Sequence, residues 1–129
     1  MLEVKALSFG FDRPLVSGLS FTVLKGRITL FHGPSGCGKS TLLALISGTA
    51  SESVNWDGSI RLGDVDIGGL PPHKRSVGLM YQDALLFPHL NVGDNLAFGL
   101  SPSVRGKERD MMVEAVSYTH LTLPTTPYV

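Results

Sequence analysis

Eight consecutive residues have the types and the spacing needed to hold a phosphate group. They are Gly33, Pro34, Ser35, Gly36, Cys37, Gly38, Lys39 and Ser40, with Thr41 following. This stretch fits the pattern G-x-x-x-x-G-K-[ST] at every fixed position. The glycines let backbone N–H groups come close to phosphate oxygens. Lys39 offers a positive charge to the β- and γ-phosphates, and the Ser40 hydroxyl can coordinate Mg²⁺. The motif therefore predicts a nucleotide site.

The flanking segments predict how this loop is positioned. Residues 27–32 are mostly apolar and β-favouring, which indicates a strand that leads into the loop. Residues 41–47 favour a buried helix that leaves it, with Gly48 as the stop. A helix that begins near Gly38 directs its unpaired N–H groups and positive dipole end at a bound anion.

The rest of the chain predicts an α/β fold. Strands over 2–9 and 19–24 come before the loop, and their short connections favour antiparallel pairing. A hairpin over 59–62 and 65–67 follows the helix, and another strand is expected over 76–81. The remaining helices are expected over 92–98 and 107–116. Gln82 stands at the carboxyl end of a predicted strand, where ligands gather in open α/β sheets. From its position alone, Gln82 could either contact a nucleotide or be an ordinary polar residue at a strand end.

Two other side chains have both a functional and a structural interpretation. Phe11 lies in a polar turn, where its ring could stack on a base, but an aromatic residue that covers the core edge is the more frequent case. Cys37, the single cysteine, is either a reactive thiol within the phosphate loop or a small filler, and it excludes an internal disulfide.

Composition narrows the class of partner. The chain has 129 residues, with 11 basic and 11 acidic side chains, so it lacks the excess of positive charge typical of direct nucleic-acid binding. No apolar run approaches the length that crosses a membrane, and the first residues do not form a secretory signal. These features favour a cytoplasmic location.

Four stretches together resemble the N-terminal half of an ATP-binding cassette, the nucleotide-binding subunit of ABC transporters. They are residues 7–11, 33–43, 58–71 and 75–90. The last is the most specific, because a glutamine followed by an apolar Leu-Phe-Pro segment is similar to the family's Q-loop. Within the family, the chain most resembles bacterial importers of the thiamine, polyamine and molybdate type.

This resemblance implies a P-loop NTPase core with an N-terminal antiparallel β subdomain. It implies that Phe11 stacks on adenine and that residues 33–41 form the Walker A loop for ATP. It also implies that Gln82 contacts Mg²⁺ and, with Lys39, serves the catalytic site. Residues 83–90 would meet a transmembrane permease subunit at the inner face of the cell membrane. A second ATP-binding cassette would complete a dimer.

The sequence also departs from the family pattern. It contains no signature segment of the LSGGQ type and no Walker B strand ending in Asp-Glu, so we expect a cassette truncated before both. One interpretation is part of an import ATPase, and another is a nucleotide-binding fragment without activity of its own. A GTPase is the third, because residues 66–69 match D-x-x-G, but no N-K-x-D motif accompanies them.

The last thirteen residues differ from everything before them. Residues 117–129 contain no acid, lysine or arginine and are rich in threonine and proline. We expect a partial ATP-binding domain over 1–116 and a non-native or disordered tail over 117–129. An added edge strand is the structural alternative, because threonine and tyrosine favour strands.

Overall fold

The computed structural model describes residues 1–83 and 85–116, which belong to two compact units. The first unit comprises Met1–Met80, and the second begins at Tyr81. The expected tail over 117–129 lies outside the described residues. Within the described residues, no helix is long and apolar enough to cross a membrane.

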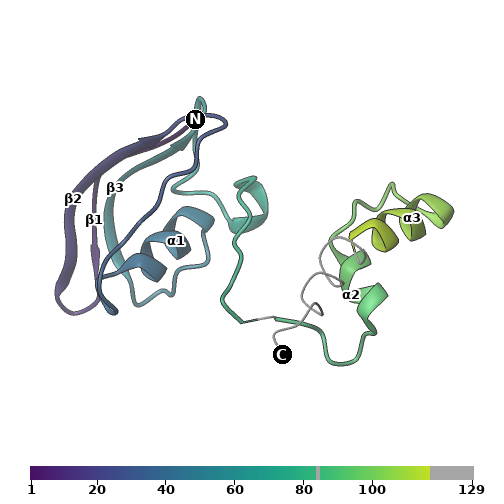
Figure 1. Ribbon diagram of the computed structural model, residues 1–129. Helices are drawn as coiled ribbons and strands as arrows, with labels where there is room; N and C mark the ends of the chain where they lie inside the picture. The colour runs from purple at the N-terminus through teal and green to yellow at the C-terminus, as the bar shows by residue number, and fades with distance from the viewer. Residues whose placement is uncertain (84, 117–129) are drawn as a thin grey trace. The chain divides into compact units, whose positions relative to one another are not determined.

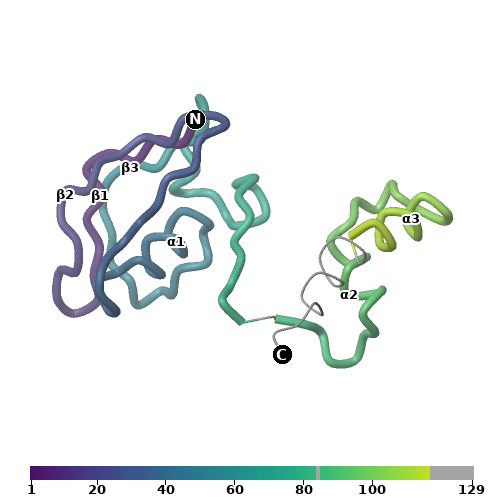
Figure 2. Tube along the Cα trace, viewed as in Figure 1, coloured from purple at the N-terminus to yellow at the C-terminus, as the bar shows by residue number. Residues whose placement is uncertain are grey.

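A four-stranded antiparallel sheet forms the framework of the first unit (Figure 1). Its strands are β1 (Leu2–Gly10), β2 (Pro14–Val23), β3 (Asn55–Leu62) and β4 (Val65–Asp66), in the order β2-β1-β3-β4. The central strand β1 pairs with β2 on one side and β3 on the other, and Figure 2 shows the three strands running side by side. The predicted antiparallel sheet is thus confirmed, although β2 and β3 begin earlier than expected.

The helix α1 (Lys39–Ser47) packs against this sheet. Its buried side chains Leu42, Leu45 and Ile46 join a core that includes Val4 and Leu7 of β1. Gly48 ends the helix in a left-handed conformation, with φ of 84°, and its N–H donates to the Ala44 carbonyl. This arrangement confirms both the predicted helix and its stop.

A local irregularity in β1 aligns its core residues. Ala6 has a positive φ of 49°, and the pairing with β2 shifts between Val4 and Leu7. Because a bulge adds one residue to a strand, Val4 and Leu7 can share a face although they are three positions apart. Phe9 follows on the same buried face and reaches the phosphate loop.

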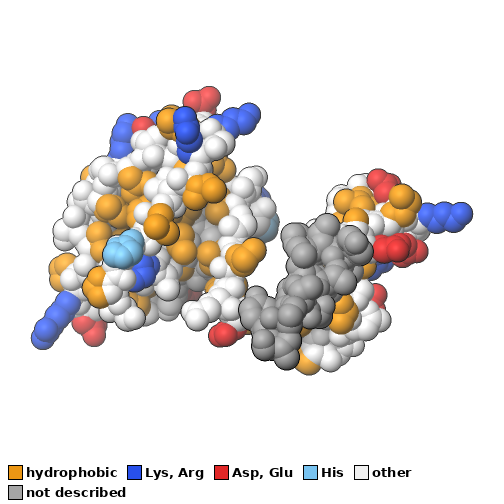
Figure 3. All heavy atoms as spheres, in the orientation of Figure 1, with side chains coloured by type: hydrophobic (Ala, Val, Ile, Leu, Met, Phe, Trp, Pro, Cys, Tyr) orange, Lys and Arg blue, Asp and Glu red, His pale blue; other side chains and the backbone are white. Residues whose placement is uncertain are grey.

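Two predicted strands are wrong. Residues 27–32 and 76–81 have no strand assignment, and Ile28 and Leu30 are 99% and 83% exposed. Met80 is similarly exposed, at 94%. A β-strand is stabilised by backbone hydrogen bonds to a neighbouring strand. Among the described residues, neither segment pairs with another strand. Hydrophobic side chains consequently remain at the surface of the first unit, as the space-filling view illustrates (Figure 3).

The second unit contains the helices α2 (Val92–Phe98) and α3 (Gly106–Val116), which contact each other. Asn91 caps α2 by accepting a hydrogen bond from the Asp94 N–H at 2.8 Å. Both helices match their predicted ranges to within a residue.

A short 3₁₀ helix, η1 (Pro72–Lys74), lies earlier in the chain, near the end of the first unit.

Candidate functional site: a phosphate loop at the start of helix α1

The residues from Gly33 to Gly38 form a compact loop that leads directly into α1. The Cys37 N–H donates to the Pro34 carbonyl at 3.3 Å, which closes a turn. Gly36 and Gly38 have positive φ values of 80° and 102°. L-residues rarely adopt this backbone region, so the motif glycines meet a conformational need.

Gly38 is also required by close packing. A Cβ atom at this position would lie 3.0 Å from a Leu15 side-chain carbon and 3.1 Å from a Phe9 ring carbon. The start of α1 therefore rests directly on β1 and β2, which fixes the loop against the sheet. At Gly33, an added Cβ would lie 2.9 Å from the Cys37 Sγ. Cys37 is half-buried and thus packs inside the loop.

The N-terminus of α1 is free to receive an anion. Gly38 occupies the N-cap without a side-chain hydrogen bond, and no acidic residue lies in the first turn. The first N–H groups of a helix have no intrahelical partner, and the helix dipole places partial positive charge beside them. The loop can therefore present several donors to one phosphate group.

The Lys39 side chain folds back over the loop. Its Nζ donates to the Gly33 carbonyl and, at 3.0 Å, to the Pro34 carbonyl. The ammonium group is thereby held above the same backbone whose N–H groups would contact phosphate. An incoming phosphate would exchange these neutral acceptors for anionic ones, which form stronger hydrogen bonds with a charged donor.

Ser40 and Thr41 follow in the first turn, and the Ser40 side chain is exposed. Its hydroxyl oxygen is suited to serve as one ligand of Mg²⁺. Magnesium usually also binds carboxylates and substrate phosphates, and the described residues contain no group of three or more His, Cys, Asp or Glu that could hold a metal. Ser40 as a magnesium ligand therefore stays a prediction.

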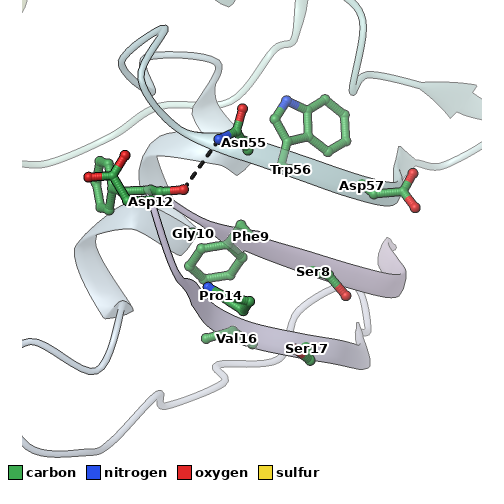
Figure 4. Close-up of a pocket in the computed structure, with 11 residues that line it drawn as sticks. Ser8, Phe9, Gly10, Asp12, Pro14, Val16, Ser17, Asn55, Trp56 and Asp57 are labelled. Atoms are coloured by element: carbon green, nitrogen blue, oxygen red, sulfur yellow. Dashed lines mark hydrogen bonds between the residues drawn. The ribbon is translucent and has the colours of Figure 1, made fainter.

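A pocket of about 450 Å³ lies beside this loop, between β1, β2 and β3. Phe9 lines the pocket and also lies next to Gly38, so the pocket and the phosphate loop share a wall. Phe11 is 47% exposed at the rim, and Asn55 Nδ2 donates to its carbonyl at 3.3 Å. Figure 4 shows this bond and shows Trp56 and Asp57 following Asn55 along β3. An exposed ring and a cavity of this size can accommodate a base.

Gln82, by contrast, belongs to the second unit and is exposed. Its predicted contact with the nucleotide stays a prediction. Sequence reasoning missed Phe9, Leu15 and Asn55, because their positions beside the loop depend on contacts between distant segments. Asp66, the first residue of the D-x-x-G match, accepts a local hydrogen bond from the Gly68 N–H at 3.0 Å. It therefore serves a turn beside β4.

Comparison with known proteins shows the family of this chain. The family model described as ABC transporter matches residues 16–126. The spermidine/putrescine import ATP-binding protein PotA of Bacteroides thetaiotaomicron is 48% identical over 103 residues, which cover 78% of this chain and 21% of that protein. The diacetylchitobiose uptake system ATP-binding protein MsiK of Streptomyces coelicolor is 39% identical over 115 residues, covering 88% of this chain and 30% of that protein.

A third relative is the putrescine transport ATP-binding protein PotG of Escherichia coli, at 42% identity over 101 residues. That match covers 78% of this chain and 26% of PotG. The chain thus spans less than a third of the length of these three relatives. The family model nevertheless matches most of this chain, and its range of 16–126 includes the whole phosphate loop. The chain therefore belongs to the ABC transporter family, whose ATP-binding domain is a P-loop NTPase.

Proposed function

We propose that this chain is the nucleotide-binding part of an ATPase subunit that powers solute import through a membrane permease. The observation that carries this proposal is the loop before α1, where an uncapped helix N-terminus, left-handed glycines and the Lys39 ammonium converge. The names of the relatives support the importer assignment, because they describe import or uptake ATP-binding proteins.

In this proposal, the loop from Gly33 to Thr41 binds the phosphates of ATP. The backbone N–H groups and Lys39 neutralise the phosphate charge, and Ser40 supplies one oxygen to Mg²⁺. Phe11 stacks on adenine at the rim of the pocket. The Phe9 side chain separates this pocket from the phosphate loop. Gln82 completes the contact on the γ-phosphate and Mg²⁺ side.

The segment over residues 83–90 is proposed as the surface that meets the permease. Leu85 and Leu86 are 69% and 66% exposed, so apolar area is available for a partner. The partner would place the cassette at the inner face of the cell membrane, where a second cassette would share the nucleotide.

Equilibrium binding of Mg-ATP to the 129-residue chain tests the proposal. We expect Lys39→Ala to weaken binding by at least about 1.5–3 kcal/mol, the scale of a hydrogen bond to a charged group. Lys25→Ala, which removes a positive charge from an exposed turn, is the matched control and should bind normally. Equal affinity of the Lys39→Ala variant and the unmodified chain would refute the site.

A second function is a nucleotide-binding fragment without turnover. The described residues offer no carboxylate cluster for the metal, and the sequence has no Walker B strand. Both functions predict ATP binding, so they are separated by measuring phosphate release beside binding.

A further inference from the structure

Arg75 is a buried cation at the end of η1, far along the chain from the phosphate loop. It is only 7% exposed, and burial lowers the pKa of its guanidinium from the usual value. Its donors reach four backbone carbonyls: Nε to Leu70 at 2.7 Å, Nη1 to Leu45 at 2.7 Å and Ile46 at 3.4 Å, and Nη2 to Gly68 at 2.9 Å.

Two of these carbonyls belong to the last turn of α1. Leu45 and Ile46 lie within four residues of the helix end, where carbonyls lack intrahelical partners. The guanidinium thus satisfies two of them and places a positive charge at the negative end of the helix dipole. Through Gly68 and Leu70, the same side chain ties this helix end to the segment that follows β4.

Gly48 makes this contact possible. A Cβ atom there would lie 2.5 Å from Arg75 Nε and 2.9 Å from Cζ. The glycine therefore has two functions: it adopts the left-handed helix stop, and it leaves room for the guanidinium against the helix end.

The opposite end of α1 is the phosphate loop. Because α1 has nine residues and a helix rises by about 1.5 Å per residue, the two ends are only about 14 Å apart. A shift at the C-terminal end of so short a helix would be carried to Gly38, which packs tightly on Phe9 and Leu15.

We propose that Arg75 is a positioning residue for phosphate binding. Its guanidinium locks α1 in place and offsets the negative end of the helix, so that the N-terminal donors stay aligned with the phosphates. This inference rests on the proposed nucleotide-binding function. It predicts that the effect of Arg75 falls on phosphate recognition, beyond any effect on folding.

The test compares Arg75→Met and Arg75→Lys with Arg61→Met. Arg61 is an exposed arginine of β3 that donates to the Asp64 carbonyl at 3.0 Å, so it controls for loss of an arginine from the same unit. Affinities for Mg-ATP and for adenosine are measured on the 129-residue chain, well below each variant's unfolding midpoint. We expect Arg75→Met to weaken ATP binding about threefold or more and to leave adenosine binding unchanged. Arg75→Lys should recover part of the loss, because it restores the charge without the forked contacts.

A second pair of variants tests the same contact without removing the charge. Gly48→Ala should displace the guanidinium and reproduce the selective loss of ATP affinity. Gly63→Ala is its control, because Gly63 also has a positive φ, 59°, but an added Cβ there meets nothing within 4 Å. Combining Gly48→Ala with Arg75→Met should add little to either single change.

The outcomes separate the two proposals. If the unmodified chain fails to bind ATP, the proposed function falls. If Lys39→Ala loses ATP binding while folded Arg75→Met retains it, the positioning role falls and the nucleotide site stands. If Arg75→Met does not fold, the ATP affinities of Arg75→Lys and Gly48→Ala test the positioning role instead. Normal ATP affinity in both of these variants would overturn the inference.

Discussion

Single side chains around the phosphate loop are proposed for different parts of the nucleotide. Lys39 and the glycines are the candidates for binding the phosphates, whereas Phe11 is the candidate for the base. The Phe11 ring is exposed and its backbone is held by Asn55, so the ring can take a stacked position without displacing core atoms. The sequence alone left Phe11 open between a core residue and a stacking platform. Its 47% exposure favours the platform.

We predict that Phe11→Ala weakens ATP binding by about 1–3 kcal/mol, the range for stacking of a base on an aromatic ring. Phe11→Trp should keep the affinity, because it preserves the aromatic face. Fluorescence titration with an ATP analogue measures both. Phe98→Ala removes an exposed ring from the second unit and is the control. An unchanged affinity in Phe11→Ala would return this ring to a structural role.

At the scale of elements, a single amide organises the loop before α2. Asn95 Oδ1 accepts from the Phe87 N–H at 2.8 Å, and its Nδ2 donates to the carbonyls of Leu90 at 3.1 Å and Asn91 at 2.9 Å. The Phe87 and Phe98 rings pack with centroids 4.7 Å apart. The proposed permease surface is thus held in shape by the helix that follows it.

We predict that Asn95→Ala releases this loop. The backbone N–H of Phe87 loses its acceptor, so its hydrogen exchange should accelerate, and the change should destabilise the second unit by about 0.5–1.5 kcal/mol per lost bond. Amide exchange followed by NMR measures this locally. Ser103→Ala, which removes one hydroxyl of an exposed serine pair in the same unit, is the control. Slow exchange at Phe87 in Asn95→Ala would contradict the assignment.

At the scale of the molecule, the chain carries the proposed nucleotide-binding loop, and the described residues contain no group of three or more His, Cys, Asp or Glu that could hold a metal. Phosphoryl transfer needs a metal-bound carboxylate and a group that orients water, in addition to the phosphate loop. The resemblance implies that such groups lie in family segments that this sequence lacks. We therefore expect ATP binding and turnover to be separable in the 129-residue chain.

We predict that the purified 129-residue chain binds ATP without hydrolysing it at a rate typical of a cassette. Release of inorganic phosphate under saturating Mg-ATP provides the measurement, with Lys39→Ala as the background control. Robust release that disappears in Lys39→Ala would show that the chain carries a complete catalytic site.

The segment over residues 117–129 provides a further test. Because the phosphate loop and the pocket belong to the unit Met1–Met80, we predict that deletion of 117–129 leaves ATP affinity unchanged. The family model matches as far as residue 126, so the origin of this segment needs a direct test. Resequencing of the source gene checks it, and recovery of the same codons would contradict a non-native tail.

The sequence determined the local features of this protein. The phosphate loop, the helix that follows it and the Gly48 stop were predictable because spacing, glycine conformation and helix-end chemistry act within a few residues. The helix over 92–98 was predictable for the same reason, since Asn91 is a strong N-cap.

Tertiary structure decided the features that depend on distant segments. The contacts of Phe9 and Leu15 with Gly38, and of Arg75 with the end of α1, join residues that no local pattern connects. Residues 27–32 and 76–81 have strand-like sequences, yet they form no strand, because a strand requires a paired neighbour and not only the right side chains. Local propensity therefore specified the nucleotide loop, and long-range packing decided what holds it in place.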